Sequence, residues 1–345
     1  MIRVGIISAS GYAGAELVRY LLGHPEVRIT YLSSHTFSGR PLSDAYPSLI
    51  GQDLPLCEEY DPDVAAEKAD IFFQAHGNGV GMRVAPTLLE RGKKFVDIPA
   101  DFRLKDPGVY KKYYGSDHTA VDLLREAIYG VPELRAEQIS RARIVANPGC
   151  YATGAILALA PLVAERCVDL DSIVIDSKSG VSGAGRSKIE VANLFTEVNE
   201  GFKAYGVASH RHTPEIEQEL STLAGANLKV TFTPHLVPMN RGILTTAYAR
   251  LTKTDVDIIS LYREFYAGRR FVVVLESGQQ PNTKNVFGTN YCHIGIAQDV
   301  RTGVAIITSA IDNMGKGAAG QAVQNMNLMC GLEEHLGLTS PAVFP

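Results

Sequence analysis

Short apolar runs alternate with helical patterns along the first 150 residues of the chain. The strand-like runs lie at 2–8, 27–33, 70–74, 94–98 and 143–146. Apolar residues recur at helical spacing between them, over about 12–23 and 79–91. Strands that alternate with helices are typical of β-α-β units, so this half of the chain predicts an α/β, Rossmann-type doubly wound parallel sheet.

The pattern changes after residue 150. Longer β-rich runs lie at 171–178, 228–235, 242–251, 271–275, 290–298 and 303–310. Helical patterns lie near 214–224, 255–267 and 315–330. We therefore expect a first domain over 1–148, an α+β domain with a mixed or antiparallel sheet over 149–314, and a final helix within 315–345.

One cysteine stands at the expected boundary. In "ARIVANPGCYATGAILALAPLV" (142–163) a strand ends, residues 147–149 form a turn, and helical spacing begins at Tyr151. Cys150 is thus expected at a helix N-terminus, which favours negative charge and lowers the pKa of a thiol. The alternative is a buried cysteine used as a small apolar residue, an interpretation that fits the other four cysteines well. Those are Cys57, Cys167, Cys292 and Cys330.

A glycine-rich turn follows the first strand, in "GIISASGYAGAELVRYLL" (5–22). Gly11 and Gly14 occupy the last two positions of a G-x-x-G-x-x-G loop, and Ser8 occupies the first. Such a loop lets a dinucleotide pyrophosphate approach the backbone at a helix N-terminus. The alternative is a glycine-rich turn that binds no ligand.

The end of the second strand bears on which dinucleotide binds. An NAD site normally carries a carboxylate there for the ribose 2′-hydroxyl. The segment "TYLSSHTFSGR" (30–40) has Ser33 and Ser34 instead, with Arg40 and His35 nearby. Hydroxyls and cations suit a 2′-phosphate, so we favour NADP over NAD; the alternative is that these are ordinary polar loop residues.

A thiolate between a dinucleotide domain and a second domain suggests attack on a carbonyl carbon that also exchanges hydride with a nicotinamide. Such a cysteine needs a base, and the candidates lie in "YGVASHRHTPEIEQEL" (205–220). Thr213 is expected as a helix N-cap, which puts His212 just before the helix. We choose His212 as general acid/base, Glu215 as an orienting carboxylate, and His210 as the reserve candidate. No third ligand with zinc spacing is near, so no metal site is expected.

Eight sequence blocks, in order, resemble those of one enzyme family. They are "SASGYAGAELVR" (8–19), "ADFRL" (100–104), "YGVPEL" (129–134), "NPGCYAT" (147–153), "SGVSGAGR" (179–186), "HRHTPEI" (210–216), "FTPHLVPMNRGI" (232–243) and "KGAAGQAVQN" (316–325). The chain resembles the N-acetyl-γ-glutamyl-phosphate reductases, NADP-dependent enzymes of arginine biosynthesis that are related to aspartate-semialdehyde dehydrogenase. The resemblance covers essentially the whole length.

The resemblance implies a reaction and roles for several residues. N-acetyl-γ-glutamyl phosphate is reduced by NADPH to N-acetylglutamate 5-semialdehyde and phosphate, through a thioester on the cysteine of "NPGCYAT", which is Cys150. The histidine of "HRHTPEI" that acts as acid/base is placed on His212. Arg103 is expected near the substrate phosphate, and Asn147 with nearby backbone N–H groups is expected to hold the oxyanion. Further substrate-binding candidates are Arg241, Ser182 and His210. For Arg103 and Arg241 the alternative is an ion pair within the protein, which for Arg241 is equally open.

The resemblance suggests that the final helix returns to the cofactor domain. It also assigns to NADP(H) a set of residues that extends beyond the glycine loop. The assigned residues are Ser8, Ser10, Gly11, Tyr12, Ala13, Gly14, Ser33, Ser34, Arg40, His76, Gly77, Ser182, Gly183 and Asn313. Ser8 departs from the glycine usual in the family.

Three alternatives stay open. A related reductase acts on an N-acylated α-aminoadipyl phosphate, one methylene longer, and no residue here separates the two substrates. A non-catalytic NADP-binding regulator would keep the same fold. An aspartate-semialdehyde dehydrogenase is less favoured because the block at 210–216 fits the glutamyl-phosphate enzymes better.

Composition limits the classes of partner that the protein is expected to bind. The net charge of −4 and the lack of a basic run argue against nucleic acid and anionic membranes. The longest apolar runs, such as 155–164, are too short to span a bilayer. Five scattered cysteines favour free thiols in a reducing compartment. We therefore expect a cytoplasmic homo-oligomer, a dimer or tetramer, that acts on a small molecule.

Overall fold

The computed structural model describes residues 1–75, 77–187, 190–253 and 256–343. The chain forms two compact units, which are described separately. The first unit comprises Met1–Pro148, Gly185–Ser187 and Ala318–Ser340. The second unit comprises Gly149–Ala184, Lys188–Gly317 and Pro341–Pro345.

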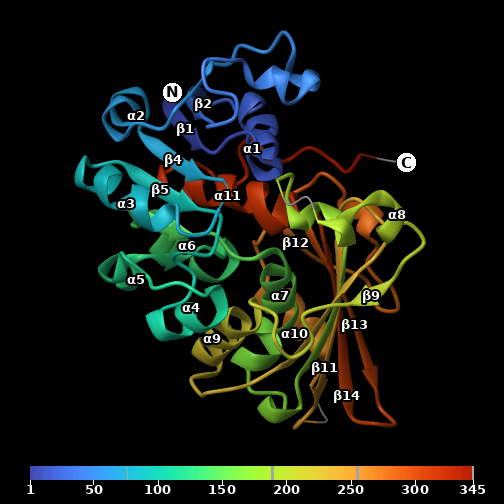
Figure 1. Ribbon diagram of the computed structural model, residues 1–345. Coiled ribbons are helices and arrows are strands. Elements are labelled where there is room, and N and C mark those ends of the chain that lie inside the picture. The colour runs from blue at the N-terminus through green and yellow to red at the C-terminus, as the bar shows by residue number, and fades with distance from the viewer. Residues whose placement is uncertain (76, 188–189, 254–255, 344–345) are drawn as a thin grey trace. The chain divides into compact units, whose positions relative to one another are not determined.

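The first unit contains a seven-stranded parallel sheet in the order β3-β2-β1-β4-β5-β7-β6 (Figure 1). Its strands are β1 (Ile2–Ile7), β2 (Val27–Ser33), β3 (Cys57–Glu58), β4 (Ile71–Gln74), β5 (Lys94–Asp97), β6 (Ile128–Tyr129) and β7 (Ile144–Ala146). The strand order reverses between β1 and β4, which is where open α/β sheets bind ligands beyond the carboxyl ends of their strands. The loop after β1 therefore lies at the position expected of a ligand site.

Helices accompany the strands of this unit. They are α1 (Tyr12–Leu22), α2 (Pro62–Lys68), α3 (Gly81–Glu90), α4 (Pro107–Tyr114), α5 (Val121–Glu126), α6 (Pro132–Ser140) and α11 (Gly320–Met329). α11, far along the chain, packs against α1, α6 and β5. It continues a π-helical turn at Gly315–Ala319.

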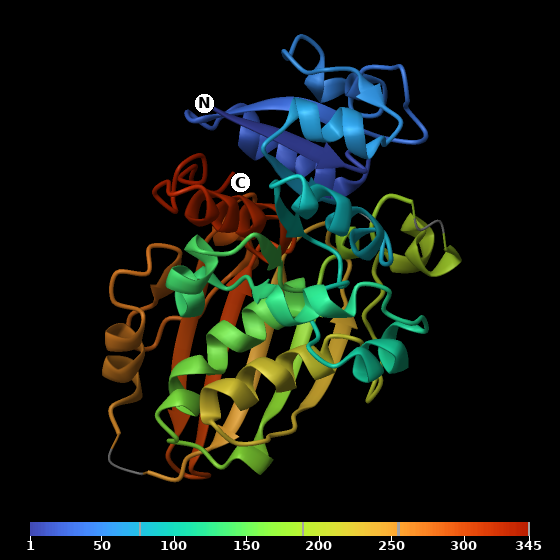
Figure 2. The same ribbon diagram turned by 90° about the vertical axis from the view of Figure 1, so that its left-hand side faces the viewer.

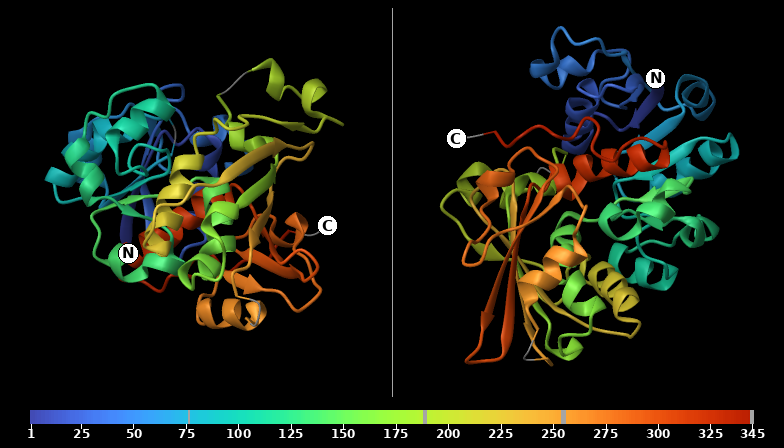
Figure 3. Two further views of the ribbon diagram at one scale, coloured as in Figure 1. Left: turned by 90° about the horizontal axis from the view of Figure 1, so that it is seen from below. Right: turned by 180° about the vertical axis from the view of Figure 1, so that it is seen from behind.

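The second unit contains a seven-stranded mixed sheet in the order β12-β13-β14-β11-β8-β10-β9. Its strands are β8 (Val174–Ser179), β9 (Lys203–Ala204), β10 (Thr231–Leu236), β11 (Ile243–Arg250), β12 (Val272–Val274), β13 (Cys292–Asp299) and β14 (Val304–Ile311). Two pairs are parallel, β8 with β10 and β12 with β13. The other pairs are antiparallel, including the long β13–β14 pair drawn in orange and red in Figure 3.

Helices α7 (Cys150–Ala164) and α9 (Thr213–Ala224) lie side by side over one face of this sheet, as Figure 2 shows in green and yellow. The remaining helices of the unit are α8 (Phe195–Val198) and α10 (Ile258–Phe265). Residues 151–163 of α7 are all buried, and α7 packs against β11 and β14. The N-terminus of α7 is thus carried by a helix embedded in the core. Within the described ranges, every helix is too short or too polar to cross a lipid bilayer.

Candidate active site

Cys150 is the first residue of α7. The residue before it, Gly149, has both its backbone N–H and its backbone carbonyl hydrogen-bonded. The Gly149 N–H donates to Glu215 Oε1 at 2.7 Å, and the Gly149 carbonyl accepts from Thr153 Oγ1 at 3.1 Å. Glu215 is fully buried in α9. The carboxylate that sequence reasoning assigned to orienting a histidine therefore also holds the turn that precedes the thiol.

The start of α7 offers a favourable site for a negative charge. In the described chain no side chain caps this helix, and its first turn contains no acidic residue. The N-terminal N–H groups and the helix dipole therefore favour an anion, such as a thiolate or a developing oxyanion.

Cys150 differs in exposure from three of the other four cysteines, and Cys330 shares its partial exposure. Cys150 is partly exposed, whereas Cys57, Cys167 and Cys292 are buried. Burial, together with the charge of Asp44, raises the pKa of Cys57 to about 11, and burial also raises the pKa of Cys167 and Cys330. The thiols of Cys57, Cys167 and Cys330 are therefore protonated and unreactive at neutral pH.

His212 and His210 lie at the start of α9 with different environments. The helix begins at Thr213 with His212 as N-cap, one residue earlier than expected, and no side chain caps it among the described residues. The backbone N–H of His212 donates to His210 Nδ1 at 3.1 Å. Burial, aided by the charge of Arg211, lowers the pKa of His210 to about 4. His210 is therefore a neutral imidazole whose Nδ1 is an acceptor.

Aromatic rings surround these histidines. The Tyr151 ring lies 5.5 Å from His210 and 5.9 Å from His212, measured between centroids, and Tyr205 donates its hydroxyl hydrogen to the Tyr151 hydroxyl at 2.8 Å. Burial raises the pKa of both tyrosines, that of Tyr205 to about 12, and the charge of Cys150 adds to the increase. Sequence reasoning missed Tyr151 and Tyr205, because an aromatic residue at a helix start or in a loop resembles an ordinary core residue.

Gly317 was also missed. A Cβ added at Gly317 would lie 2.8 Å from the Cβ of Cys150, closer than real contacts allow. The π-helical turn at Gly315–Ala319 therefore approaches Cys150 so closely that only glycine fits at position 317. The two glycines of "KGAAG" (316–320) were the feature of the sequence that could have indicated this close approach. The sequence does not reveal the contact itself, because Gly317 and Cys150 are 167 residues apart.

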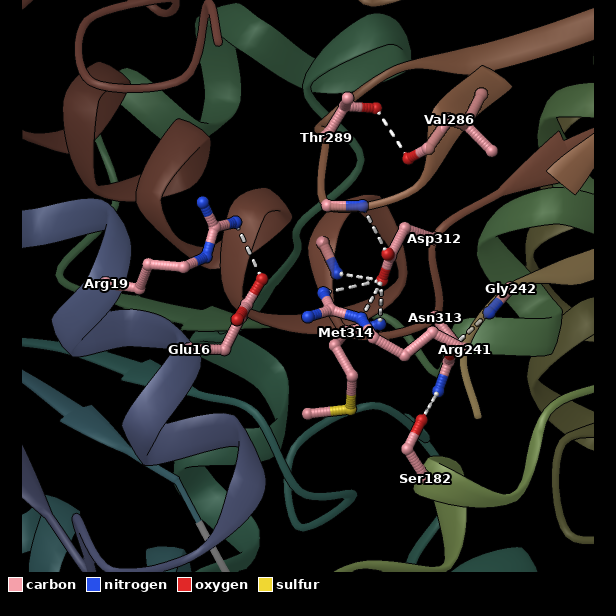
Figure 4. Close-up of polar contacts among 12 residues, drawn as sticks. Glu16, Arg19, Ser182, Arg241, Gly242, Val286, Thr289, Asp312, Asn313 and Met314 are labelled. Atoms are coloured by element: carbon pink, nitrogen blue, oxygen red, sulfur yellow. Dashed lines mark hydrogen bonds and ion pairs between the residues drawn. The ribbon is translucent and has the colours of Figure 1, made fainter. Parts of the chain in front are cut away.

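Arg241 forms an ion pair with Asp312, which sequence reasoning did not single out. Arg241 donates from Nε and Nη2 to Asp312 Oδ1 at 3.1 and 2.8 Å (Figure 4). Asp312 is fully buried and also accepts from the backbone N–H groups of Gly288, Met314 and Gly315. An ion pair was the alternative that the sequence left open for Arg241.

Asn313 joins two segments of the second unit. Its Oδ1 accepts from the Gly242 N–H at 2.7 Å, and its Nδ2 donates to Ser182 Oγ at 2.9 Å (Figure 4). Gly183 follows within a short 3-10 turn at Val181–Ala184. The structure thus brings Ser182, Gly183 and Asn313 together.

Asn147 and Arg103 belong to the first unit, where their polar groups are used internally. Asn147 is fully buried; its Nδ2 donates to the Ala318 carbonyl at 3.1 Å, and its Oδ1 accepts from Asn325 Nδ2 at 3.1 Å. Arg103 donates to the carbonyl oxygens of Asn147 (2.8 Å) and Ile98 (2.6 Å). These contacts hold the chain just before the cysteine.

The glycine loop after β1 has the conformation that close approach requires. Ser8 adopts φ 62°, a left-handed conformation that glycine adopts without strain. A Cβ at Gly14 would lie 2.3 Å from the Ala9 carbonyl oxygen, so only glycine lets α1 pack here. Gly11 is the N-cap of α1; in the described residues no side chain caps the helix and its first turn has no acid. Ser10, Tyr12 and Ala13 complete the loop and the helix start.

The end of β2 is more internally bonded than the sequence suggested. Ser33 Oγ accepts from the Ser8 N–H at 3.2 Å, and the Ser34 and Ser10 hydroxyls are 2.9 Å apart. Arg40 pairs with Asp44 at 2.7 Å. After β4, Gly77 has φ 86°, and His76 lies outside the described residues.

No group of three or more His, Cys, Asp or Glu side chains in the described chain is arranged to hold a metal ion.

Comparison with known proteins identifies the relatives of the whole chain. The family model described as semialdehyde dehydrogenase, NAD binding domain, matches residues 3–142, and the model described as semialdehyde dehydrogenase, dimerisation domain, matches 150–313. N-acetyl-gamma-glutamyl-phosphate reductase of Geobacter metallireducens is 53% identical over 348 residues and covers 100% of both chains. The enzyme of that name from Pelotomaculum thermopropionicum is 51% identical, covering 100% of this chain and 99% of its own.

Solved structures agree on the fold. Aspartate semialdehyde dehydrogenase II of Vibrio cholerae superposes with a TM-score of 0.73 at 17% identity, covering 96% of this chain and 98% of that one. The parallel sheet and the mixed sheet confirm the predicted fold class. With half of its residues identical to these reductases over its full length, the chain belongs to the semialdehyde dehydrogenase family and, within it, to the N-acetyl-γ-glutamyl-phosphate reductases.

Proposed function

We propose that the protein reduces N-acetyl-γ-glutamyl phosphate with NADPH to N-acetylglutamate 5-semialdehyde, phosphate and NADP⁺. The observation that carries this function is the partly exposed Cys150 at the uncapped N-terminus of α7, in a chain that matches these reductases from end to end. A thiolate there is a suitable nucleophile for an acyl phosphate.

Cys150 forms the S–C bond with the acyl carbon, and the C–O bond to phosphate breaks with its electron pair leaving on phosphate. The backbone N–H groups of the first turn of α7 stabilise the oxyanion of the tetrahedral intermediate, an effect worth roughly 3 kcal/mol per donor. We assign the oxyanion to these groups because the side-chain amide of Asn147 is bonded to Ala318 and Asn325. Asn147 is a positioning residue that holds the turn.

When bound, NADPH supplies the hydride that reduces the thioester carbon. His212 donates a proton to the former carbonyl oxygen, which gives a thiohemiacetal on Cys150. His212 takes this proton back as the C–S bond breaks, so that the semialdehyde leaves and the Cys150 thiolate is restored. His210 is a poorer acid because burial keeps it neutral, and its Nδ1 fixes the backbone of His212. Glu215 positions the nucleophile through Gly149.

The first unit fits a dinucleotide. The uncapped N-terminus of α1 leaves N–H groups for a pyrophosphate, and Gly14 lets the helix approach the loop. We propose that 1–148 holds NADP(H), through the loop at 8–14 and the residues after β2 and β4, and that 149–314 carries the chemistry. The segment 315–345 contributes α11 to the cofactor unit. Ser182, Gly183 and Asn313 are further candidates for binding the cofactor.

The substrate is an anion and needs cations. We propose Arg103 for its phosphate and Arg241 for its carboxylate, with Ser182 and His210 as further contacts. Asp312 holds the Arg241 guanidinium in a fixed direction, which suits recognition of a planar carboxylate.

We also propose that the enzyme is a homo-oligomer, a dimer or tetramer, in the cytoplasm. Support comes from the description of the model that matches 150–313 as a dimerisation domain and from five free thiols. Sedimentation of the purified chain tests the oligomer.

The function is tested in the reverse direction. We expect N-acetylglutamate semialdehyde to sustain steady-state reduction of NADP⁺, beyond the first turnover, only when phosphate is present, and the Cys150→Ser variant to show no turnover while it binds NADPH within a few-fold of wild type. Parallel reactions use the aminoadipate homologue, aspartate semialdehyde and NAD⁺. Faster turnover of either other semialdehyde, or a phosphate-independent steady-state rate, contradicts the proposed function.

A further inference from the structure

Arg186 reaches the glycine loop of the first unit from a distant part of the sequence. The segment Gly185–Ser187 packs with the first unit, although the ranges on both sides of it belong to the second. Arg186 Nη1 donates to the Ser10 carbonyl at 3.3 Å. The guanidinium lies 5.0 Å from the Tyr46 ring centroid and 5.8 Å from that of Phe37. Arg186 is thus attached to the loop between β1 and α1.

The same loop is bonded to the end of β2. The Tyr46 hydroxyl also donates to the Ser10 carbonyl, at 2.9 Å, and Ser10 Oγ lies 2.9 Å from Ser34 Oγ. Ser34 follows the last residue of β2. Arg186 and the end of β2 therefore flank the same residue, Ser10.

The positive charge of Arg186 is available to bind an anion. In the described part of the chain no carboxylate lies within ion-pair distance of it, and its contacts are the Ser10 carbonyl oxygen, the Tyr46 hydroxyl and two aromatic faces. Arg40, the cation favoured from the sequence, is paired with Asp44 at 2.7 Å. An exposed guanidinium that is stacked on rings and free of acids is suited to bind an anion.

The end of the second strand is where Rossmann-type domains distinguish NADP from NAD, and an arginine near it accommodates the 2′-phosphate. Here the hydroxyls of Ser33 and Ser34 are already bonded within the protein. We propose that Arg186 binds the 2′-phosphate of NADP(H) and is the residue that determines specificity for NADP(H) over NAD(H). This assignment rests on the proposed function and names a binding residue for it.

The test is equilibrium binding, which does not depend on turnover. The chain has no tryptophan, so the fluorescence of bound NADPH and NADH can be followed with little interference. We expect Arg186→Ala to weaken NADPH about tenfold to a hundredfold, the range for a charged hydrogen-bonding partner, and to change NADH less than threefold. Calorimetry with 2′,5′-ADP and 5′-AMP should show the same contrast without the nicotinamide. Arg186→Lys should lose less than Arg186→Ala.

A matched control is Arg141→Ala, which removes an exposed arginine of the same unit that pairs with Glu137; it should bind both nucleotides as wild type does. Equal losses for NADPH and NADH in Arg186→Ala, or no loss for either, would overturn the proposal, provided that its melting temperature matches wild type. So would a selective loss of NADPH in Arg40→Ala with Arg186→Ala unaffected. Selective loss in Arg186→Ala with a wild type that does not turn over the acyl phosphate would support Arg186 and refute the proposed reaction.

Discussion

His210 and His212 are two residues apart in the sequence and have different tasks because of their surroundings. His210 is enclosed by the rings of Tyr151, Tyr205 and Phe232, and this burial keeps it neutral. Its Nδ1 accepts the His212 backbone N–H, so it acts on the backbone of its neighbour. We therefore propose His212, and not His210, for the acid/base role.

Replacing each histidine by asparagine separates these tasks. We expect His212→Asn to lower kcat about a hundredfold or more, the usual contribution of a general acid/base. His210→Asn keeps an acceptor near the position of Nδ1 and should lose less than tenfold. Steady-state kinetics across pH 6–9 decides between them. A near wild-type rate for His212→Asn would move the role to His210.

His210 also makes stability depend on pH. Its pKa is about 4 in the folded protein and about 6.5 when unfolded, so the unfolded chain binds more protons between these values. This titration leaves the unfolding free energy unchanged above about pH 6.5. As the pH falls towards 4 it lowers the unfolding free energy by up to about 3 kcal/mol. The unfolding free energy of wild type minus that of His210→Asn, measured from pH 7 to 4, should fall accordingly. A pH-independent difference would show that His210 is not buried in its neutral form.

The positions of candidate site residues in the fold were predictable where a local pattern carries them. Cys150 follows a turn and starts a helix, and the glycines of the first loop lie at a fixed spacing, so short stretches sufficed. Gly317 and Asp312 act through contacts with Cys150 and Arg241, and no local pattern reports a contact between segments so far apart. Arg186 lay within a recognised block, yet its position beside Ser10 depends on the tertiary fold.

At the scale of elements, α1 depends on its approach to the loop that precedes it. Gly14→Ala places a Cβ 2.3 Å from the Ala9 carbonyl oxygen, and we expect a loss of about 1–3 kcal/mol in unfolding free energy with weaker NADPH binding. Gly23→Ala, at the other end of the same helix, meets only the Tyr20 carbonyl at 3.8 Å and should stay within about 0.5 kcal/mol. Equal stability and NADPH affinity in the two variants would contradict this packing.

Asp312 joins three segments of the second unit. It accepts from Gly288, from Arg241, and from the turn that begins at Met314. Asp312→Ala leaves these donors without an acceptor, and we expect about 3–5 kcal/mol of destabilisation by thermal or chemical unfolding. Glu276→Ala breaks an exposed ion pair with Arg263 and should cost less than about 1 kcal/mol. A similar loss of unfolding free energy in both variants would mean that the buried hydrogen bonds of Asp312 do not stabilise the fold more than an exposed ion pair does.

Most long elements could be predicted from periodicity, and the exceptions have a common cause. β1, β2, β4, β5 and β7 lie within one or two residues of the expected strands. The missed strands β3, β6 and β9 have two residues each, too few to show an alternation of apolar and polar positions. Helices α4, α5 and α6 are short, and α4 and α6 begin at a proline, so they resemble loops in the sequence.

At the scale of the molecule, the two units divide the requirements of the reaction. The first supplies an uncapped helix at a strand-order reversal, which suits a dinucleotide, and the second supplies a thiol at the end of a buried helix. The proposed reaction requires that Cys150 form a thioester with the acyl group.

The most direct test mixes the enzyme with N-acetylglutamate semialdehyde and NADP⁺ without phosphate, and follows NADPH absorbance and the mass of the Cys150 peptide. Without phosphate to release the acyl group, we predict a burst of one NADPH per active site and an N-acetylglutamyl adduct on Cys150. Cys150→Ser should give neither signal. A burst that persists in Cys150→Ser, or a wild-type burst with no adduct on Cys150, would contradict the account.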